Sequence, residues 1–458
     1  MPLSNNIALP LARAIMLCTL VVLPWLHGAE LFWEQLFVAA GLFTALVVML
    51  WDKHALARLP TGSLLITGLF GIWLLHTVLY LVPLPSSLIA WISPNTYQWL
   101  SSVEVADYGY LSLYRQASVI ELFKFSGLVA IFLLVGRLFT TRRQLRWFSA
   151  VVVASGALTA VYSLLNFTSG GAFELVSAIP PWNLSWHEGI RGTFSYKNQY
   201  AMYMVICIAL CAGLLTDELI KRRQRTALVT PVTCGLSLLL LILLATLMNT
   251  SSRGALVSLL VGCAVAAAFF ISRNRYLAGY MMQPKVLGSM AAAAVLLITL
   301  FMQSSIYERF TDEKMQDNGR TLLRNTVIQV IEDYPVFGTG PGTYPFVQHN
   351  YKPLELGNTQ MSKRAHNDYL ETLATQGALG FALLMIPLGL LLIRLFRYSL
   401  HGNTTGLLIG CQVATVAYLV QALFDVNIGV YLLPVHLLIV LSIGWVLTTR
   451  FTRDKPAL

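Results

Sequence analysis

The sequence predicts an all-α polytopic membrane protein with about twelve transmembrane helices. Hydrophobic residues make up 56% of the 458-residue chain and charged residues only 11%, whereas charged residues make up about a quarter of a typical soluble domain. Apolar runs of about 20 residues, long enough to cross a bilayer, recur along the chain. Lysines and arginines gather in every second short connection between these runs. These observations exclude a soluble fold and make the lipid bilayer a partner of the protein.

The apolar runs are expected to be helical, because hydrocarbon offers no partner for unsatisfied backbone groups. Continuous runs such as residues 238–244 lack the alternation that the strands of a transmembrane barrel require. Arg13 lies inside the first run, which has no small-residue cleavage site before Trp25, so we expect an uncleaved span. The expected spans are residues 7–26, 31–51, 62–83, 118–139, 145–166, 199–216, 227–248, 253–272, 286–303, 374–394, 404–424 and 428–449.

The distribution of positive charge predicts the orientation of these helices in the membrane. A net charge of +10 could indicate a nucleic-acid partner. The positions of the positive residues follow the positive-inside rule, which favours membrane topology as the reason for the charge. The short connections 27–30 and 425–427 contain no lysine or arginine. We therefore place both termini in the cytoplasm and expect no nucleic-acid partner. The basic connections contain Lys53, Arg58, Arg137, Arg142, Arg143, Arg146, Lys221, Arg222, Arg223, Arg225, Arg273, Arg275, Lys285, Arg394, Arg397, Arg450, Arg453 and Lys455.

Three outer connections, 84–117, 167–198 and 304–373, exceed the roughly 15 residues beyond which loops are usually functional or disordered. The first carries an amphipathic, aromatic stretch and is predicted to cover the membrane surface. The last is expected to form a small helical domain. The predicted organisation places nine transmembrane helices in residues 1–303, the large loop domain in 304–373, and three further transmembrane helices in 374–458.

A helix is predicted inside the large loop, because apolar residues recur at helical spacing between residues 320 and 333. Pro335 and the glycines that follow it end this helix in a tight turn, since proline lacks an amide proton and glycine permits positive φ. The apolar stripe consists of Leu323, Val327, Val330 and Ile331.

Positive charges on the outer side run against the topological rule and indicate an anionic partner. Arg191 and Arg253 lie at outer span ends, at headgroup depth, and two converging guanidinium forks suit a diphosphate. The alternative is simple headgroup anchoring. Flanking glycines and polar neighbours, including Tyr196 and Asn198, favour a ligand. The outer charges are Arg191, Lys197, Arg253, Arg309, Arg320, Arg324, Lys352, Lys363 and Arg364.

His366 lies just before the tenth expected span, near the outer surface, and its imidazole could act as a general base for a hydroxyl group. The alternative is a loop histidine bonded to backbone. His349 is a second candidate on the same loop. Asp425 and Glu371 are the carboxylates best placed to orient a base or balance the arginines, although Asp425 could equally cap a helix. The spacing of acidic and histidine residues predicts no catalytic metal, and no phosphate-binding glycine loop is present.

Four sequence blocks resemble the O-antigen ligase and O-antigen polymerase superfamily of bacterial membrane glycosyltransferases. The last block continues with nine residues after His366-Asn367 and then Gly377-x-x-Gly380, a spacing similar to that of the ligase branch. This chain has Phe381 where that pattern has threonine. The blocks are residues 191–198, 252–256, 318–342 and 365–370.

The resemblance implies the C-type membrane glycosyltransferase architecture with a large helical periplasmic loop, located in the bacterial cell inner membrane. It implies inverting, metal-independent and cofactor-free transfer of a preassembled glycan from undecaprenyl diphosphate to an acceptor hydroxyl at the periplasmic face. By similarity, Arg191 and Arg253 would hold the diphosphate and His366 would deprotonate the acceptor. Arg320 would be a further contact for phosphate or glycan. Asn367 or Glu371 would fix the histidine tautomer.

The remaining hypotheses for a glycosyltransferase differ in the acceptor molecule. The spacing after His366 favours a ligase that acts on lipid A-core. A polymerase of glycan repeat units and a protein oligosaccharyltransferase would use the same donor. A polysaccharide flippase or transporter would also suit twelve spans, but the unusual residues lie on the outer side and no inverted repeat is visible, unlike the midplane sites of transporters.

Overall fold

The chain is a bundle of long helices, as the sequence predicts. The computed structural model describes residues 5–103, 107–174, 189–222, 229–271, 318–353, 364–399 and 405–451. Within these ranges, eight helices are long and apolar enough to cross a membrane, and three shorter apolar helices accompany them. Eleven of the twelve expected spans therefore coincide with a helix. The ninth expected span, residues 286–303, lies outside the described residues.

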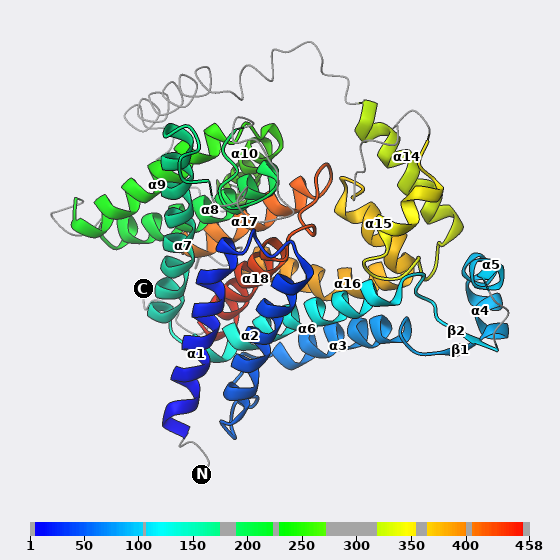
Figure 1. Cartoon of the computed structure of the whole chain (residues 1–458). Helices are drawn as coiled ribbons and strands as arrows, with labels where there is room; N and C mark the ends of the chain where they lie inside the picture. The colour runs from blue at the N-terminus through cyan, green and yellow to red at the C-terminus, as the bar shows by residue number, and fades with distance from the viewer. Residues whose placement is uncertain are drawn as a thin grey trace.

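The helices of the bundle are labelled in Figure 1. They are α1 (Asn5–Val22), α2 (Phe32–Leu50), α3 (Ser63–Leu79), α6 (Arg115–Leu138), α7 (Arg142–Thr168), α8 (Lys197–Arg222), α9 (Pro231–Asn249), α10 (Arg253–Ile271), α16 (Asp368–Ser399), α17 (Gly406–Gln421) and α18 (Leu432–Arg450). The shorter elements are η1 (Leu23–Trp25), β1 (Leu84–Pro85), α4 (Ser86–Ile92), α5 (Pro94–Val103), β2 (Tyr108–Gly109), α14 (Asn318–Asp333), α15 (Tyr344–Val347) and η3 (Gln348–Asn350).

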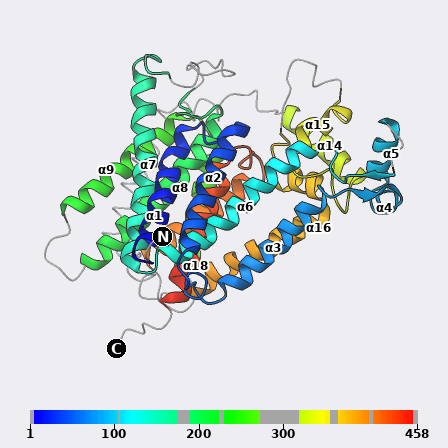
Figure 2. The ribbon, with the colours of Figure 1, turned by 60° about the horizontal axis from the view of Figure 1, so that its bottom comes forward.

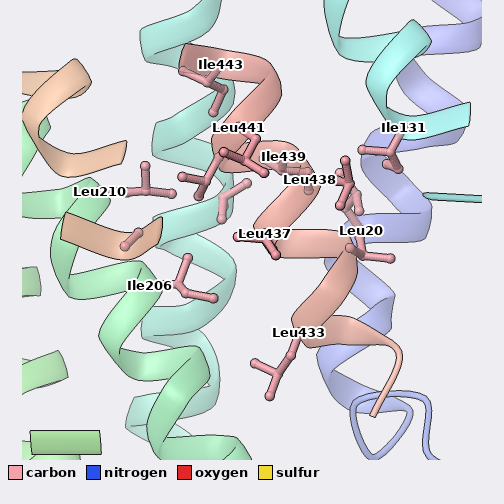
Figure 3. Close-up of a cluster of buried hydrophobic side chains, with 14 of the residues drawn as sticks. Leu20, Ile131, Ile206, Leu210, Leu433, Leu437, Leu438, Ile439, Leu441 and Ile443 are labelled. Atoms are coloured by element: carbon pink, nitrogen blue, oxygen red, sulfur yellow. The ribbon is translucent and has the colours of Figure 1, made fainter. Parts of the chain in front are cut away.

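Helix α18 forms the axis of the bundle. More than four fifths of its apolar window is buried inside the protein, whereas less than a quarter of the α16 window is. Figure 3 shows side chains of α18 meeting Leu20 of α1, Ile131 of α6 and Ile206 of α8. A helix that is apolar on all sides can be buried in this way, because it presents no polar face to solvent or headgroups. Helices α1, α6, α8, α16 and α17 pack around α18.

Helices α8 and α17 approach closely because small residues line their contact. Gly406 and Gly410 are spaced four residues apart on one face of α17, as in small-xxx-small contacts between membrane helices. A side chain at Gly410 would overlap the carbonyl of Ala209, and one at Gly406 would overlap the carbonyl of Gly213. The antiparallel pair therefore carries the start of α8 to the end of α17, where the candidate site lies.

Gly410→Ala is expected to destabilise the protein by about 1–3 kcal/mol, because the added methyl group meets backbone and forces the two helices apart. Thermal unfolding of the detergent-solubilised protein would measure the loss. Gly389→Ala in α16 is the matched control, since nothing lies within 4 Å of a side chain there. Equal unfolding temperatures for the two variants would contradict the close contact.

Helices α3, α6 and α16 run side by side toward the large loop domain in both views (Figures 1 and 2). Helix α14 confirms the predicted loop helix, and its stripe residues Val327 and Val330 are buried against Tyr344 of α15. The predicted turn glycines at 338, 340 and 342 all have positive φ. At the tip of this region, β1 pairs antiparallel with β2, and the exposed Trp91 of α4 lies nearby in sequence.

Helix α16 begins earlier than the expected start of the tenth span at residue 374. It starts at Asp368 and is broken by Gly377, which has φ 63° and ψ 179°. The freed Ala378 amide donates to the Pro335 carbonyl over 2.8 Å. The hydrophobic run locates only the part after the break, because the first turns, up to Gln376, are polar. These turns pack on the loop domain and also bond to the bundle, since Gln376 accepts from the Trp73 indole of α3 over 2.7 Å and Tyr369 donates to the Leu419 carbonyl of α17 over 2.9 Å.

The bundle has two distinct ends. At the terminal face, defined by the first half of α1 and the ends of α6 and α18, Arg13 donates to the Leu138 carbonyl over 2.7 Å and Arg450 to the Gly136 carbonyl over 3.2 Å. At the opposite loop face, the Leu432 amide donates to the Gly28 carbonyl over 2.9 Å. Both ends of the described chain thus lie at one face. Its assignment to the cytoplasm stays a prediction from charge.

Candidate functional site

The segment that carries Arg191 owes its shape to glycine. Gly192 has φ 61°, and a side chain there would overlap the ring of Tyr200 on α8. The Ile190 amide donates to the Asn249 carbonyl over 3.1 Å, which ties the segment to the turn between α9 and α10. Glycine is suited to this path because it adopts positive φ without a steric penalty. Arg191 and the turn before Arg253 are thereby brought to the same face.

The guanidinium of Arg191 lies against a carboxylate. Its side chain is 7% exposed, and Nη2 lies 3.4 Å from Oε2 of Glu174. The Asn166 side-chain amide, near the C-terminal end of α7, donates to the same oxygen over 3.0 Å. These three residues border a small pocket. A phosphate that binds Arg191 must therefore join or replace Glu174.

Arg253 is the first residue of α10, beside the turn that follows α17. A side chain at the next residue, Gly254, would lie 2.6 Å from the ring of Phe424. The start of α10 consequently packs directly on the turn that holds Asp425. This contact brings Arg253 to the loop face, where its charge is reinforced by the partial positive charge of a helix N-terminus.

His366 lies in a short loop that Glu371 holds in place. His366 has φ 52°, which is uncommon for a residue other than glycine. Oε1 of Glu371 accepts from Arg364 Nη1 over 2.7 Å, and Oε2 accepts from the Ala365 amide over 3.0 Å. Burial opposes the charge of Arg364, but the adjacent Glu371 carboxylate raises the pKa of Arg364 above its ordinary value. The ion pair thus stays formed and fixes the loop.

Asn367 caps α16. Its side-chain carbonyl accepts from the Leu370 amide over 3.0 Å, and its amide group donates to the Leu423 carbonyl over 2.7 Å. Asn367 and Glu371, which the resemblance assigns to fixing the tautomer of His366, bind backbone groups and Arg364 in the structure. The carboxylate next to the imidazole is Asp425.

Asn367→Ala is expected to cost about 1 kcal/mol of stability through the lost cap. Asn367→Asp should keep the cap but lose the bond to the Leu423 carbonyl, because a carboxylate accepts hydrogen bonds and cannot donate one. Thermal unfolding of both variants would measure the difference. Unchanged stability of the Asn367→Ala protein would contradict the capping role.

Three side chains, those of Asp425, Asn198 and Tyr196, lie around His366. Nδ1 of His366 lies 3.6 Å from Oδ1 of Asp425, and no described residue hydrogen bonds to that nitrogen. Oδ2 of Asp425 accepts from Asn198 Nδ2 over 2.6 Å, and the same amide donates to the Tyr196 hydroxyl over 2.7 Å. The Tyr196 ring presents itself nearly edge-on to the imidazole, with centroids 6.2 Å apart. Asn198 thus links Asp425 to Tyr196.

This arrangement suits proton transfer by His366. Asp425 is buried, whereas the imidazole is 22% exposed. A carboxylate beside Nδ1 favours the tautomer with hydrogen on Nδ1, which leaves Nε2 as the basic nitrogen. The same carboxylate stabilises the imidazolium that forms when Nε2 takes a proton. His366 can therefore act as a general base toward a hydroxyl group at the loop face.

The remaining predicted site residues are Arg320 and His349. The Arg320 side chain lies outside the described part of the structure, although its backbone belongs to α14. His349 is exposed on η3, and no described contact links it to His366. Among the residues that the structure describes, no group of three or more His, Cys, Asp or Glu side chains could hold a metal ion.

Sequence reasoning missed two acidic residues near the arginine segment. Glu174 faces Arg191, and Glu30 accepts a hydrogen bond from the Ser195 hydroxyl. Glu30 lies in the turn between α1 and α2, far from Ser195 in the sequence. Neither acidic residue carries a local sequence signal, because each contact depends on the fold.

Residues 238–385, about a third of the chain, match the family model described as O-antigen ligase. No curated protein matches the chain. The matched segment contains Arg253, Arg320 and His366. Arg191 and Asp425 lie outside it, and they are brought to it by the contacts described above.

Proposed function

We propose, from the premise that residues 238–385 belong to the O-antigen ligase superfamily, that this membrane protein is a glycosyltransferase with a lipid-linked donor. It moves a preassembled glycan from undecaprenyl diphosphate to an acceptor hydroxyl, namely that of lipid A-core, at the periplasmic face. The observation that carries the proposal is the pairing of His366 with Asp425 on the same face as Arg191 and Arg253.

The proposed reaction is a single displacement. The acceptor hydroxyl oxygen attacks the anomeric carbon, the bond from that carbon to the diphosphate oxygen breaks, and the configuration inverts. Nε2 of His366 takes the hydroxyl proton, and Asp425 stabilises the resulting imidazolium. Arg191 and Arg253 balance the negative charge that grows on the leaving diphosphate. The donor is already activated, so the residues need neither a nucleotide nor a metal ion.

One residue favours a second candidate function. Phe381 occupies the position at which the pattern of the ligase branch has threonine. A repeat-unit polymerase would use the same donor, the same base and the same arginines, but its acceptor would be the end of another lipid-linked glycan. The two functions differ only in the molecule that supplies the hydroxyl.

Purified protein in liposomes tests the proposal. The donor is an undecaprenyl-diphosphate glycan, and parallel reactions offer lipid A-core or a second lipid-linked repeat unit. A ligase yields glycan-modified lipid A-core, whereas a polymerase yields a longer lipid-linked glycan. Absence of both products, with folded protein and chemically intact donor, would contradict glycosyl transfer.

A further inference from the structure

A second cavity opens at the terminal face, away from the loop face that carries His366. Its volume is about 330 Å³, and it lies among the start of α7, the end of α8, the start of α17 and the end of α18. The glycosyl-transfer proposal uses none of its side chains. The cavity is lined by Arg142, Arg143, Arg146, Asp217, Ile220, Lys221, Thr405, Leu407 and Leu447.

More positive than negative side chains line this cavity, which we call the basic cavity. Arg146 is already engaged, because its guanidinium lies 3.4 Å from Asp217 and also contacts Glu218. Arg142 stacks its guanidinium over the Phe451 ring at 5.1 Å. Among the described residues, no carboxylate forms an ion pair with Arg142 or Arg143. These two guanidinium groups therefore leave net positive charge at the cavity.

Two helices start at the cavity and add to its positive potential. Helix α7 is capped by Thr141, whose hydroxyl accepts from the Gln144 amide over 3.2 Å. Helix α17 is capped by Thr405, whose hydroxyl accepts from the Leu408 amide over the same distance. Each N-terminus carries roughly half a positive charge. The arginines and the helix starts thus act in the same direction on an anion.

The remaining wall of the cavity is apolar. Ile220, Leu407 and Leu447 come from three different transmembrane helices and border the same space as the arginines. A small hydrated anion gains nothing from such a wall, whereas the glycerol and first acyl carbons of a phospholipid do. Basic pockets between transmembrane helices are known to suit anionic lipid headgroups.

We propose that the basic cavity binds a phosphate group, supplied by the headgroup of an anionic phospholipid. Arg142 and Arg143 hold the phosphate oxygens, the N-termini of α7 and α17 add to the field, and the apolar wall receives the start of the acyl chains. Asp217 lines the cavity and also accepts from the Gly406 amide over 2.5 Å, so it joins α8 to α17. A ligand bound beside Asp217 would stabilise this contact between the two helices.

The test measures thermal unfolding and bound lipid by native mass spectrometry. Detergent-purified protein receives phosphatidylglycerol, phosphatidylethanolamine, inorganic phosphate or pyrophosphate. Phosphatidylglycerol is expected to raise the unfolding temperature by several degrees and to remain bound, whereas phosphatidylethanolamine does neither. In Arg142→Gln/Arg143→Gln protein, at least ten times more phosphatidylglycerol should be needed for the same shift.

Lys53→Gln/Arg58→Gln is the matched control, since it removes the same charge from exposed residues at the terminal face. It should keep the wild-type response. Arg143→Gln alone serves if the double variant does not fold. A shift with inorganic phosphate that is lost in the cavity variant would support the site and assign it to a soluble ligand. Equal lipid responses in the cavity and control variants would overturn the proposal.

Discussion

His366→Ala is expected to lower the rate of glycan transfer about 10²–10⁴-fold, the usual contribution of a general base. The protein should still insert and fold, because the loop around His366 is held by Glu371 and Asn367 and not by the imidazole. Transfer is measured in liposomes with lipid-linked donor, under saturating acceptor. The lost rate should appear in kcat, since the proton is taken only as the hydroxyl reacts.

The chain offers a matched control for this prediction. His349→Ala removes an exposed histidine from the same large loop and should leave transfer unchanged. Asp425→Asn should lower the rate as well, because an amide beside Nδ1 no longer stabilises the imidazolium. Normal transfer by His366→Ala protein would exclude the proposed base. Normal transfer by Asp425→Asn protein alone would exclude only the assistance by that carboxylate.

Arg191→Ala and Arg253→Ala are each expected to reduce transfer about 10²–10³-fold, the magnitude lost when one group that stabilises transition-state charge is removed. Arg191→Lys should recover only part of this loss, because an ammonium keeps the charge but not the planar fork that pairs with phosphate. Initial rates over a range of donor concentrations would measure both effects. Arg324→Ala removes an exposed arginine of α14 and serves as control.

The Glu174→Gln variant tests whether Arg191 contacts the diphosphate or only forms a structural ion pair. If Arg191 serves only to pair with Glu174, then Glu174→Gln should reduce transfer as strongly as Arg191→Ala does. If Arg191 binds the donor, Glu174→Gln should keep most of the activity, because the guanidinium remains available for phosphate. Equal losses in the two variants, together with equal losses of stability, would contradict the donor contact.

The helices were predictable because each depends on a local pattern. Apolar runs of sufficient length mark the spans, and the stripe through Val327 and Val330 marks α14. The N-terminal part of α16 was not predictable from hydropathy, because its polar first turns pack on the loop domain. Its start depends on the Asn367 cap and its break on Gly377, and neither changes the hydrophobic run.

The candidate site was predictable only as a set of residue types. His366 and Asp425 stood out through their positions at predicted outer span ends, but their proximity results from the start of α16 and the end of α17 lying at the same face. The Ala422 carbonyl accepts from the Asp368 amide over 2.9 Å, and this long-range bond has no sequence signature. The link from Asn198 to Asp425 likewise depends on the close contact of α8 with α17, which small residues permit but do not specify.

The central position of α18 has a consequence for biogenesis. Every other described helix leaves the ribosome before α18, yet α18 supplies the surface against which α1, α6 and α8 pack. Until it inserts, these helices can hold only partial contacts. Its first residues also close the loop face, since the Leu432 amide binds the turn after α1. Nascent chains should therefore remain sensitive to protease and unable to transfer glycan until this late segment has entered the bilayer.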